Sequence, residues 1–330
     1  MLALALVVGA ASALQSARLD CRAAPKSRIV AQRQTPSLAA RRLQGLRLAA
    51  AVGAAPEGPY AGPLSVKVGG KALNLNGVAF VASMTVWVTA LYPLVLVCAT
   101  FSLLFDKSKR RAMDAVVALW AKVSMLTVGY APQIRNPENL PPRGKAVMYI
   151  PNHCSYLDIL TLSGFLGRPF KYISKIEILR IPLIGWAMGF AGHVAIKRAD
   201  RRSQLETYKQ AVQSLKDGNS LVVFAEGTRS LDGTLKDFKR GPFKMAMDAG
   251  VDIVPIALCD LYRWHPPSAL MPLKRPRGVE IAIMPAVKMA PGKTADDLMK
   301  EVRAAIDGAL PSHQKNVTPP AAAAVPAAAA

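Results

Sequence analysis

A short apolar stretch, Ala146-Val147-Met148-Tyr149-Ile150, ends at Pro151 and is followed by Asn152-His153-Cys154-Ser155-Tyr156-Leu157-Asp158 and a second apolar run. Consecutive apolar residues closed by a proline are typical of a buried strand. The apolar run after the polar octet 151–158 is predicted to be helical. The stretch therefore predicts a strand, a loop and a helix in succession, which is the repeating unit of an α/β fold.

The same alternation continues through the chain. Further strands are predicted at 194–196, 221–225, 253–258 and 279–284, and helices at 202–215, 243–248 and 294–310. Strands that alternate with helices are typical of an α/β domain with a mostly parallel sheet flanked by helices. We place this domain at 131–310 and expect an N-terminal membrane-embedded helix or helical hairpin before it.

The two ends of the chain have a different composition. Residues 1–56 start with a short apolar run, and between Gln15 and Pro56 they hold eight basic residues and one acid. This pattern predicts a targeting presequence, followed by a linker at 57–77. A two-part plastid presequence has these features, and secretory and mitochondrial signals share some of them. Residues 311–330 are rich in alanine and proline and are predicted to be a disordered tail.

An uncharged segment of 28 residues, 78–105, precedes the domain. A membrane-spanning helix needs about 20 apolar residues, so this segment is predicted to enter the membrane, as one helix kinked at Pro93 or as a re-entrant hairpin. The basic cluster that ends it predicts that the domain lies on the cytosolic or stromal side. Residues 106–130 are predicted to hold an amphipathic helix on the membrane or on the domain. We expect an integral protein of a plastid membrane, with the endoplasmic reticulum as the alternative.

The composition limits the class of protein. The 330 residues carry a net charge of +21, and 52% of them are hydrophobic but only 6% aromatic. Such an excess of basic residues indicates an anionic partner. No nucleic-acid-binding motif is present, and a basic cluster beside a long apolar run favours a membrane surface. The four cysteines form no CxxC pair, so neither a disulfide framework nor a zinc site is expected.

His153 and Asp158 lie five residues apart. On one continuous helix their side chains would point about 140° apart, which makes a direct contact awkward. If the helix begins between them, Asp158 lies in its first turn and accepts a hydrogen bond from one imidazole nitrogen. The other nitrogen is then available as a general base. Ser155 and Asp158 also fit a capping-box pattern, which is a structural alternative.

A second polar turn, Glu226-Gly227-Thr228-Arg229-Ser230, follows the predicted strand 221–225. Glycine allows a close approach of the backbone to a ligand, and Arg229 suits a bidentate contact with phosphate. Glu226 can accept a hydrogen bond from a substrate hydroxyl or orient Arg229. A purely structural Glu226–Arg229 pair at a strand end is the alternative.

Two weaker segments complete the set. A strand delivers Lys197 and Arg198 to its end, where α/β folds bind ligands, although a solvated basic edge has the same pattern. Pro255 interrupts the apolar strand 251–258, which indicates a sheet edge or a bulge.

In this order, the four segments resemble the motifs of the glycerolipid acyltransferase family, specifically of its lysophosphatidate acyltransferases. The octet 151–158 matches the NHxxxxD motif, residues 192–198 the second block, 226–230 the third and the strand with Pro255 the fourth. The stretches 136–141 and 175–186 also look like the family. His193 departs from the pattern, since the family usually has an apolar residue there, and this leaves the phosphate contacts of the second block open.

The resemblance implies transfer of a fatty acyl group from a thioester donor, either acyl-CoA or acyl-carrier protein, to the sn-2 hydroxyl of 1-acyl-glycerol-3-phosphate. His153 would be the general base and Asp158 would orient it. The implied substrate-binding residues are Lys175, Arg198, Glu226, Gly227, Thr228 and Arg229. No metal or cofactor is expected, because the thioester is already activated. The implied partners are a lysophospholipid, the acyl donor and the bilayer.

Several alternative hypotheses for the function are open at this point. The acceptor can be glycerol-3-phosphate or another lysophospholipid. A non-catalytic lipid-binding membrane protein would carry similar apolar segments. A cysteine hydrolase would need Cys154 to pair with His193 or His265. A metal site at His153 and Asp158 lacks a third ligand.

Overall fold

The structure is a computed structural model that describes residues 65–68, 71–196, 200–265, 271–272 and 278–315. A two-stranded sheet of β1 (Ser65–Val68) and β2 (Lys71–Asn74) falls in the predicted linker and comes before a long apolar helix. A domain built on a seven-stranded sheet follows. The predicted presequence, 1–56, lies outside the described residues.

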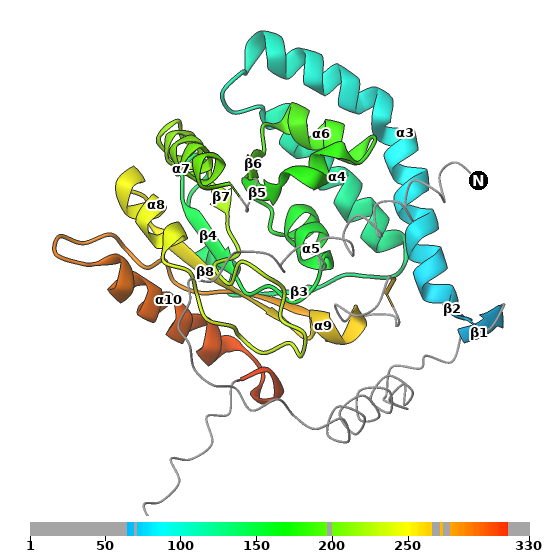
Figure 1. The fold of residues 1–330 in the computed structure, drawn as a ribbon. Coiled ribbons are helices and arrows are strands. Elements are labelled where there is room, and N and C mark those ends of the chain that lie inside the picture. Colours follow the sequence, from blue (N-terminus) through cyan, green and yellow to red (C-terminus); the bar gives the residue numbers. More distant parts are fainter. Residues whose placement is uncertain (1–64, 69–70, 197–199, 266–270, 273–277, 316–330) are drawn as a thin grey trace, which may run out of the picture.

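The large sheet has the strand order β3-β9-β8-β4-β7-β5-β6 (Figure 1). Its strands are β3 (Gln133–Arg135), β4 (Met148–Pro151), β5 (Lys171–Lys175), β6 (Val194–Ile196), β7 (Leu221–Val222), β8 (Ile253–Cys259) and β9 (Glu280–Ile283). Neighbouring strands are parallel except β8 and β9, which are antiparallel. The predicted mostly parallel sheet is confirmed. The sequence pattern did not predict β3, which is exposed, or β5, which mixes charged and apolar residues.

Helices cover both faces of this sheet (Figure 1). On one side lie α4 (Arg111–Thr127), α5 (Leu157–Phe165) and α6 (Ile184–Ala191), and on the other α7 (Arg201–Lys216), α8 (Gly241–Ala249) and α10 (Ala295–Ala309). The short elements are η1 (Pro137–Asn139), η2 (Ile176–Arg180), α9 (Leu261–Trp264) and η3 (Ser312–Gln314). The predicted helix at 294–310 is present, and Thr294 and Asp297 form a capping box at its start.

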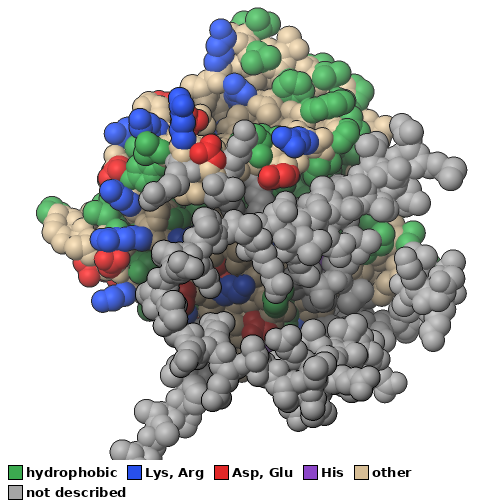
Figure 2. Space-filling view, in the orientation of Figure 1, with side chains coloured by type: hydrophobic (Ala, Val, Ile, Leu, Met, Phe, Trp, Pro, Cys, Tyr) green, Lys and Arg blue, Asp and Glu red, His purple; other side chains and the backbone are tan. Residues whose placement is uncertain are grey.

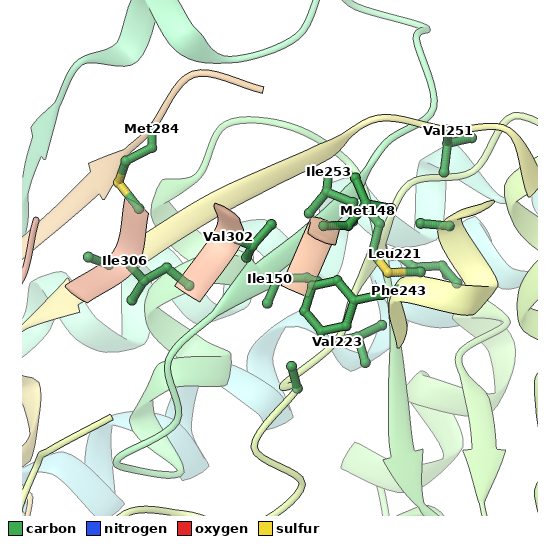
Figure 3. Close-up of a cluster of buried hydrophobic side chains, with 14 of the residues drawn as sticks. Met148, Ile150, Leu221, Val223, Phe243, Val251, Ile253, Met284, Val302 and Ile306 are labelled. Atoms are coloured by element: carbon green, nitrogen blue, oxygen red, sulfur yellow. The ribbon is translucent and has the colours of Figure 1, made fainter. Parts of the chain in front are cut away.

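The central strand β4 shows how the alternation of side chains builds two cores. Met148 and Ile150 point into a cluster with side chains of α8 and α10 (Figure 3). Tyr149 points to the opposite face, into a cluster with α5. All three side chains are fully buried. Because both faces of β4 are covered, its residues are apolar without interruption, as expected for a central parallel strand.

The apolar segment forms one continuous helix, α3 (Leu75–Phe105), with Pro93 inside it, and not a hairpin. One face, including Phe80 and Ala99, is buried in clusters shared with residues of α4. The other face exposes large apolar side chains, among them Val97 and Leu104 at 66% each. Figure 2 shows these hydrophobic side chains gathered in the upper part of the molecule. Within the part of the chain that the structure describes, α3 is the one helix long and apolar enough to cross a membrane.

One open alternative is decided and one expectation needs correction. The strand with Pro255 is not at a sheet edge, because β8 lies between β9 and β4. Ile253 bridges to Val287, whereas Ile256 pairs with Ile283. The segment 283–287 is therefore one residue longer than the segment 253–256 that it faces, which is a β-bulge. Pro255, which has no backbone N–H to donate, lies at this bulge. The predicted disordered tail also starts too early, because Gln314 is fully buried and accepts a hydrogen bond from the Asp260 N–H. Residues 316–330 lie outside the described residues.

Candidate active site

The loops that follow β4 and β7 meet at the carboxyl edge of the sheet. These strands are parallel neighbours, with Met148 beside Leu221 and Tyr149 beside Val222. His153 follows β4, and the segment from Glu226 to Arg229 follows β7. The topology therefore brings together two segments that are more than 70 residues apart in the chain.

His153 and Asp158 are in direct contact. The imidazole Nδ1 lies 2.8 Å from Oδ2 of Asp158, and the contact is possible because α5 begins at Leu157, between the two residues. Asp158 is fully buried, whereas the His153 side chain keeps 16% of its surface exposed. A carboxylate can only accept here, so Nδ1 carries the proton and Nε2 has its lone pair available.

The Asp158 carboxylate is held by the loop that it caps. Its Oδ2 also accepts the backbone N–H groups of Cys154 at 2.8 Å and Ser155 at 2.9 Å. The Ser155 hydroxyl in turn accepts the Leu157 N–H at 3.2 Å. The N-cap of α5 is Tyr156, whose side chain makes no capping hydrogen bond. The bonds that Ser155 and Asp158 make at the start of the helix coexist with the His153 contact and fix the position from which Asp158 meets the imidazole.

Glu226 joins the two loops. Its Oε1 accepts the backbone N–H of His153 at 2.7 Å, and its Oε2 accepts the N–H of Lys236 at 3.2 Å. Burial raises the pKa of the Glu226 carboxyl to about 7, although the two hydrogen bonds oppose the rise. A second hydrogen bond joins the same two loops, because the backbone N–H of Ser230 donates to the His153 carbonyl at 2.7 Å.

Two residues outside the predicted set support His153. The Phe224 ring stacks on the imidazole, with centroids 3.9 Å apart and planes 24° apart. Asn152 links β4 to β8, because its Oδ1 accepts the Leu258 N–H at 2.7 Å and its Nδ2 donates to the Leu258 carbonyl at 3.2 Å. The position of Asn152 directly before His153 is a sequence signal for it. The apolar Phe224 could not be distinguished from the other residues of the predicted strand 221–225, although β7 itself ends at Val222.

Gly227 and Arg229 lie in the turn after Glu226. Gly227 has φ +71°, a left-handed conformation, and a Cβ added to it would lie 2.7 Å from Cε of Lys239. The lysine side chain therefore covers the turn. Lys236 Nζ donates to the Arg229 carbonyl at 2.8 Å. Burial raises the pKa of Tyr156 and the charge of Arg229 opposes the rise, so this guanidinium lies near the loop that holds His153.

The remaining predicted residues are placed as follows. Thr228 is exposed in the same turn. The backbone of Lys175 ends β5 at the same carboxyl edge. Arg198 lies outside the described residues. His193 is not in this site, since it precedes β6 and its Nδ1 accepts the Tyr172 N–H at 2.9 Å.

Cys154 does not have the surroundings of a nucleophile. Its side chain is buried, and burial followed by the Asp158 charge raises the pKa of the thiol well above its usual value. The two histidines that a hydrolase would need bond elsewhere: His265 Nδ1 to the Ser155 hydroxyl at 2.9 Å and His193 to Tyr172. Of the two candidate nucleophile or base groups, Cys154 and His153, only the imidazole of His153 is partly exposed.

Comparison with known sequences places these loops in a family context. A family model described as Acyltransferase matches residues 131–259, which span the whole site. The chain is 42% identical over 233 residues to a Chlamydomonas reinhardtii protein named 1-acyl-sn-glycerol-3-phosphate acyltransferase, a match that covers 71% of this chain and 67% of that protein. It is 43% identical over 185 residues to a chloroplastic Arabidopsis thaliana protein of the same name, covering 56% of this chain and 51% of the relative.

A solved structure has the same fold. It is the crystal structure of the 1-acyl-sn-glycerophosphate acyltransferase PlsC from Thermotoga maritima, with a TM-score of 0.61 and 25% identity. The similarity covers 70% of this chain and 92% of the PlsC chain. The α/β architecture of this chain is thus shared with a solved structure of a similar protein.

Proposed function

The chain belongs to the glycerolipid acyltransferase family, and we propose that it transfers a fatty acyl group from a thioester to the sn-2 hydroxyl of 1-acyl-glycerol-3-phosphate, giving phosphatidate. The observation that carries the proposal is the 2.8 Å contact between His153 Nδ1 and the buried Asp158 carboxylate. It leaves Nε2 as a base on a partly exposed ring.

The proposed reaction needs one base and no covalent intermediate. Nε2 of His153 takes the proton of the acceptor hydroxyl while the oxygen attacks the thioester carbonyl carbon. The C–S bond then breaks, and the imidazolium returns the proton to the leaving thiolate. Asp158 stabilises the imidazolium and keeps the ring in the productive tautomer, and stacking on Phe224 limits its rotation.

The phosphate of the acceptor is proposed to bind at the turn after β7. Arg229 offers a bidentate guanidinium, and Gly227 lets the backbone approach the ligand. Lys239, which covers Gly227, adds a second cation at the same turn. Lys175, the last residue of β5, and Arg198, which follows β6 in the sequence, are the further candidates. Glu226 supports the geometry through its contact with His153 rather than through a charge offered to the substrate.

The relatives support a proposal for the location, and the location in turn favours one acyl donor. Two of the relatives are named as chloroplastic 1-acyl-sn-glycerol-3-phosphate acyltransferases. We therefore propose a plastid membrane as the location of this chain and acyl-carrier protein as its acyl donor. The acidic surface of a carrier protein would suit a chain with a net charge of +21. Acyl-CoA is the alternative donor.

Membrane attachment is proposed to use α3. Its exposed face carries large apolar side chains over the length of the helix, which water disfavours. Attachment through this face would bring a lipid acceptor, whose headgroup lies at the bilayer surface, within reach of the domain.

The test is acyl transfer by membranes that contain the full chain. Labelled 1-acyl-glycerol-3-phosphate is supplied with acyl-CoA or acyl-carrier protein, and the intact chain is compared with His153→Ala. We expect phosphatidate from the intact chain and a loss of about 10²- to 10⁴-fold in the variant. Absence of product with both donors, from folded protein, would overturn the acceptor assignment. Glycerol-3-phosphate and other lysophospholipids would then be tested as acceptors. If none of them is acylated, the alternative is a non-catalytic lipid-binding protein.

A further inference from the structure

A second pocket lies at the edge of the sheet opposite to His153. It has a volume of about 370 Å³, is open to solvent, and is lined by the first half of α4, the end of α5 and the residues that start β5. Since β4 and β5 run in the same direction, the start of β5 and the loop after β4 lie at opposite edges. The pocket is therefore separate from the candidate active site.

Small residues leave the space for this pocket. Ala115 and Ala118 line it from α4, and Gly164 and Gly167 line it from α5. A Cβ added to Gly164 would lie 2.9 Å from the backbone nitrogen of Lys122, so the two helices are in close contact beside the cavity. The pocket is thus a consequence of how α4 and α5 pack, and does not require a rearrangement to open.

The buried charges around the pocket are balanced. Asp114 Oδ1 lies 2.5 Å from Nζ of Lys171, and both side chains are over 90% buried. Asp114 is one of the residues that line the pocket, and its other carboxylate oxygen is buried without a hydrogen-bond partner among the described residues. His193 lines the pocket as a neutral ring, because burial and then Lys171 lower its pKa to about 3. Its Nδ1 accepts from Tyr172, so its proton is on Nε2 and makes it a donor.

Three arginines give the pocket an excess of positive charge. Arg111, Arg143 and Arg168 line it. Two of them are anchored to backbone carbonyls, Arg168 Nε to Pro141 at 3.1 Å and Arg111 to Gly218 at 3.4 Å. Among the described residues, none of the three forms a salt bridge with a carboxylate. Anchored guanidinium groups with remaining N–H donors are well suited to a phosphate group.

We infer that this pocket binds the phosphate of an anionic phospholipid that is neither substrate nor product. Phosphate is the class of anion that several neighbouring guanidinium groups and a neutral imidazole donor would recognise. A lipid is the source that the walls favour, because Val117, Pro169 and Phe170 give them an apolar character that a free ion does not need. Arg111 also begins α4, directly after the basic stretch that ends the apolar helix α3. One wall of the pocket therefore begins next to the basic stretch, the part of the chain expected to meet lipid headgroups.

The test measures binding to the full chain in a non-ionic detergent. The unfolding midpoint is followed while dihexanoyl phosphatidylglycerol, dihexanoyl phosphatidylcholine or inorganic phosphate is added. Arg143→Gln/Arg168→Gln is compared with Arg202→Gln/Arg240→Gln, which removes the same charge from exposed arginines paired with Glu206 and Asp296. We expect phosphatidylglycerol to raise the midpoint of the intact chain and of the control. The pocket variant, which lacks two of the three arginines, should need at least about tenfold more lipid.

Other outcomes overturn the inference. An equal response of the pocket variant and the control, or an equal effect of phosphatidylcholine, would show that the pocket does not recognise an anionic headgroup. An equal effect of inorganic phosphate would overturn the lipid as the source. If the double variant does not fold, Arg143→Gln alone serves, because this side chain is exposed. The readout is binding and not turnover, so a failure of the proposed acyl transfer would leave this result unchanged.

Discussion

The Glu226 carboxylate accepts the backbone N–H of His153 at 2.7 Å, across the gap between the loops that follow β7 and β4. Its second oxygen accepts the N–H of Lys236. Glu226 is therefore a link that fixes the position of His153. The sequence pattern suggested a substrate contact or a pair with Arg229, and neither is needed to explain a buried acid at this place.

This position makes Glu226 a source of pH-dependent stability. Its folded pKa of about 7 lies above the ordinary value of 4.5, so its contribution is fully present below pH 4.5 and is lost as the pH rises through 7. We expect the stability of the intact chain relative to Glu226→Gln to fall by about 1 to 3 kcal/mol between these values. Denaturant unfolding across this pH range measures it. Burial also raises the pKa of Asp114 to about 6. Asp114 is present in both proteins, so its contribution to the pH dependence cancels in the comparison. A difference that does not change with pH would contradict the assignment.

Asp158 is expected to act through His153. Asp158→Asn removes the charge that stabilises the imidazolium and allows the wrong tautomer, so kcat should fall by about 10²- to 10⁴-fold with little change in KM. Steady-state kinetics on the same membranes checks this. The control is Asp297→Asn, which alters the exposed capping box of α10 and should leave kcat unchanged. Equal activity of Asp158→Asn and the intact chain would refute the pairing.

Cys154→Ala should retain most of the activity. The thiol is buried and its raised pKa keeps it protonated at neutral pH, so it supplies no nucleophile. The cavity should cost about 1 to 2 kcal/mol of stability. Acyl transfer and thermal unfolding are measured side by side, with Cys98→Ala as the control. Complete loss of activity from a folded Cys154→Ala variant would support a cysteine mechanism instead.

Gly227→Ala tests the turn after β7. An alanine at φ +71° is strained by about 1 kcal/mol, and its Cβ would also displace Lys239. Gly250→Ala is a matched control, with φ +67° and open space around the added Cβ. We expect similar losses of stability in the two variants, and a raised KM for the acceptor only in Gly227→Ala. A raised KM in both would mean that the effect is general.

The exposed face of α3 is expected to hold the chain on membranes. Val97→Ser/Phe101→Ser/Leu104→Ser removes three large apolar side chains that are at least half exposed, each worth about 1.5 to 3 kcal/mol when fully buried. A larger share of the variant should appear in the soluble fraction after vesicle flotation. Leu231→Ser, which changes an equally exposed residue outside α3, should not shift it. No change in the triple variant would place the attachment elsewhere.

Local patterns were enough to predict much of the fold. The apolar runs at β4, β7 and β8 are continuous because both of their faces are buried, and this marks central parallel strands. The start of α5 follows from the capping pattern of Ser155 and Asp158, and it is the reason why the His153–Asp158 contact could be expected. The polar elements β3 and β5 escaped prediction because strand pairing, and not burial of an apolar run, defines them.

Other features depend on residues that only the strand order brings together. The link from Glu226 to His153, the stack of Phe224 on the imidazole and the tie from Asn152 to Leu258 all join neighbouring strands of the sheet. The three arginines of the second pocket likewise come from separate segments. A sequence specifies the chemistry of such residues and their local conformation. Their distances are set by long-range packing, because hydrogen bonds and charges act over a few ångströms in space whatever the separation along the chain.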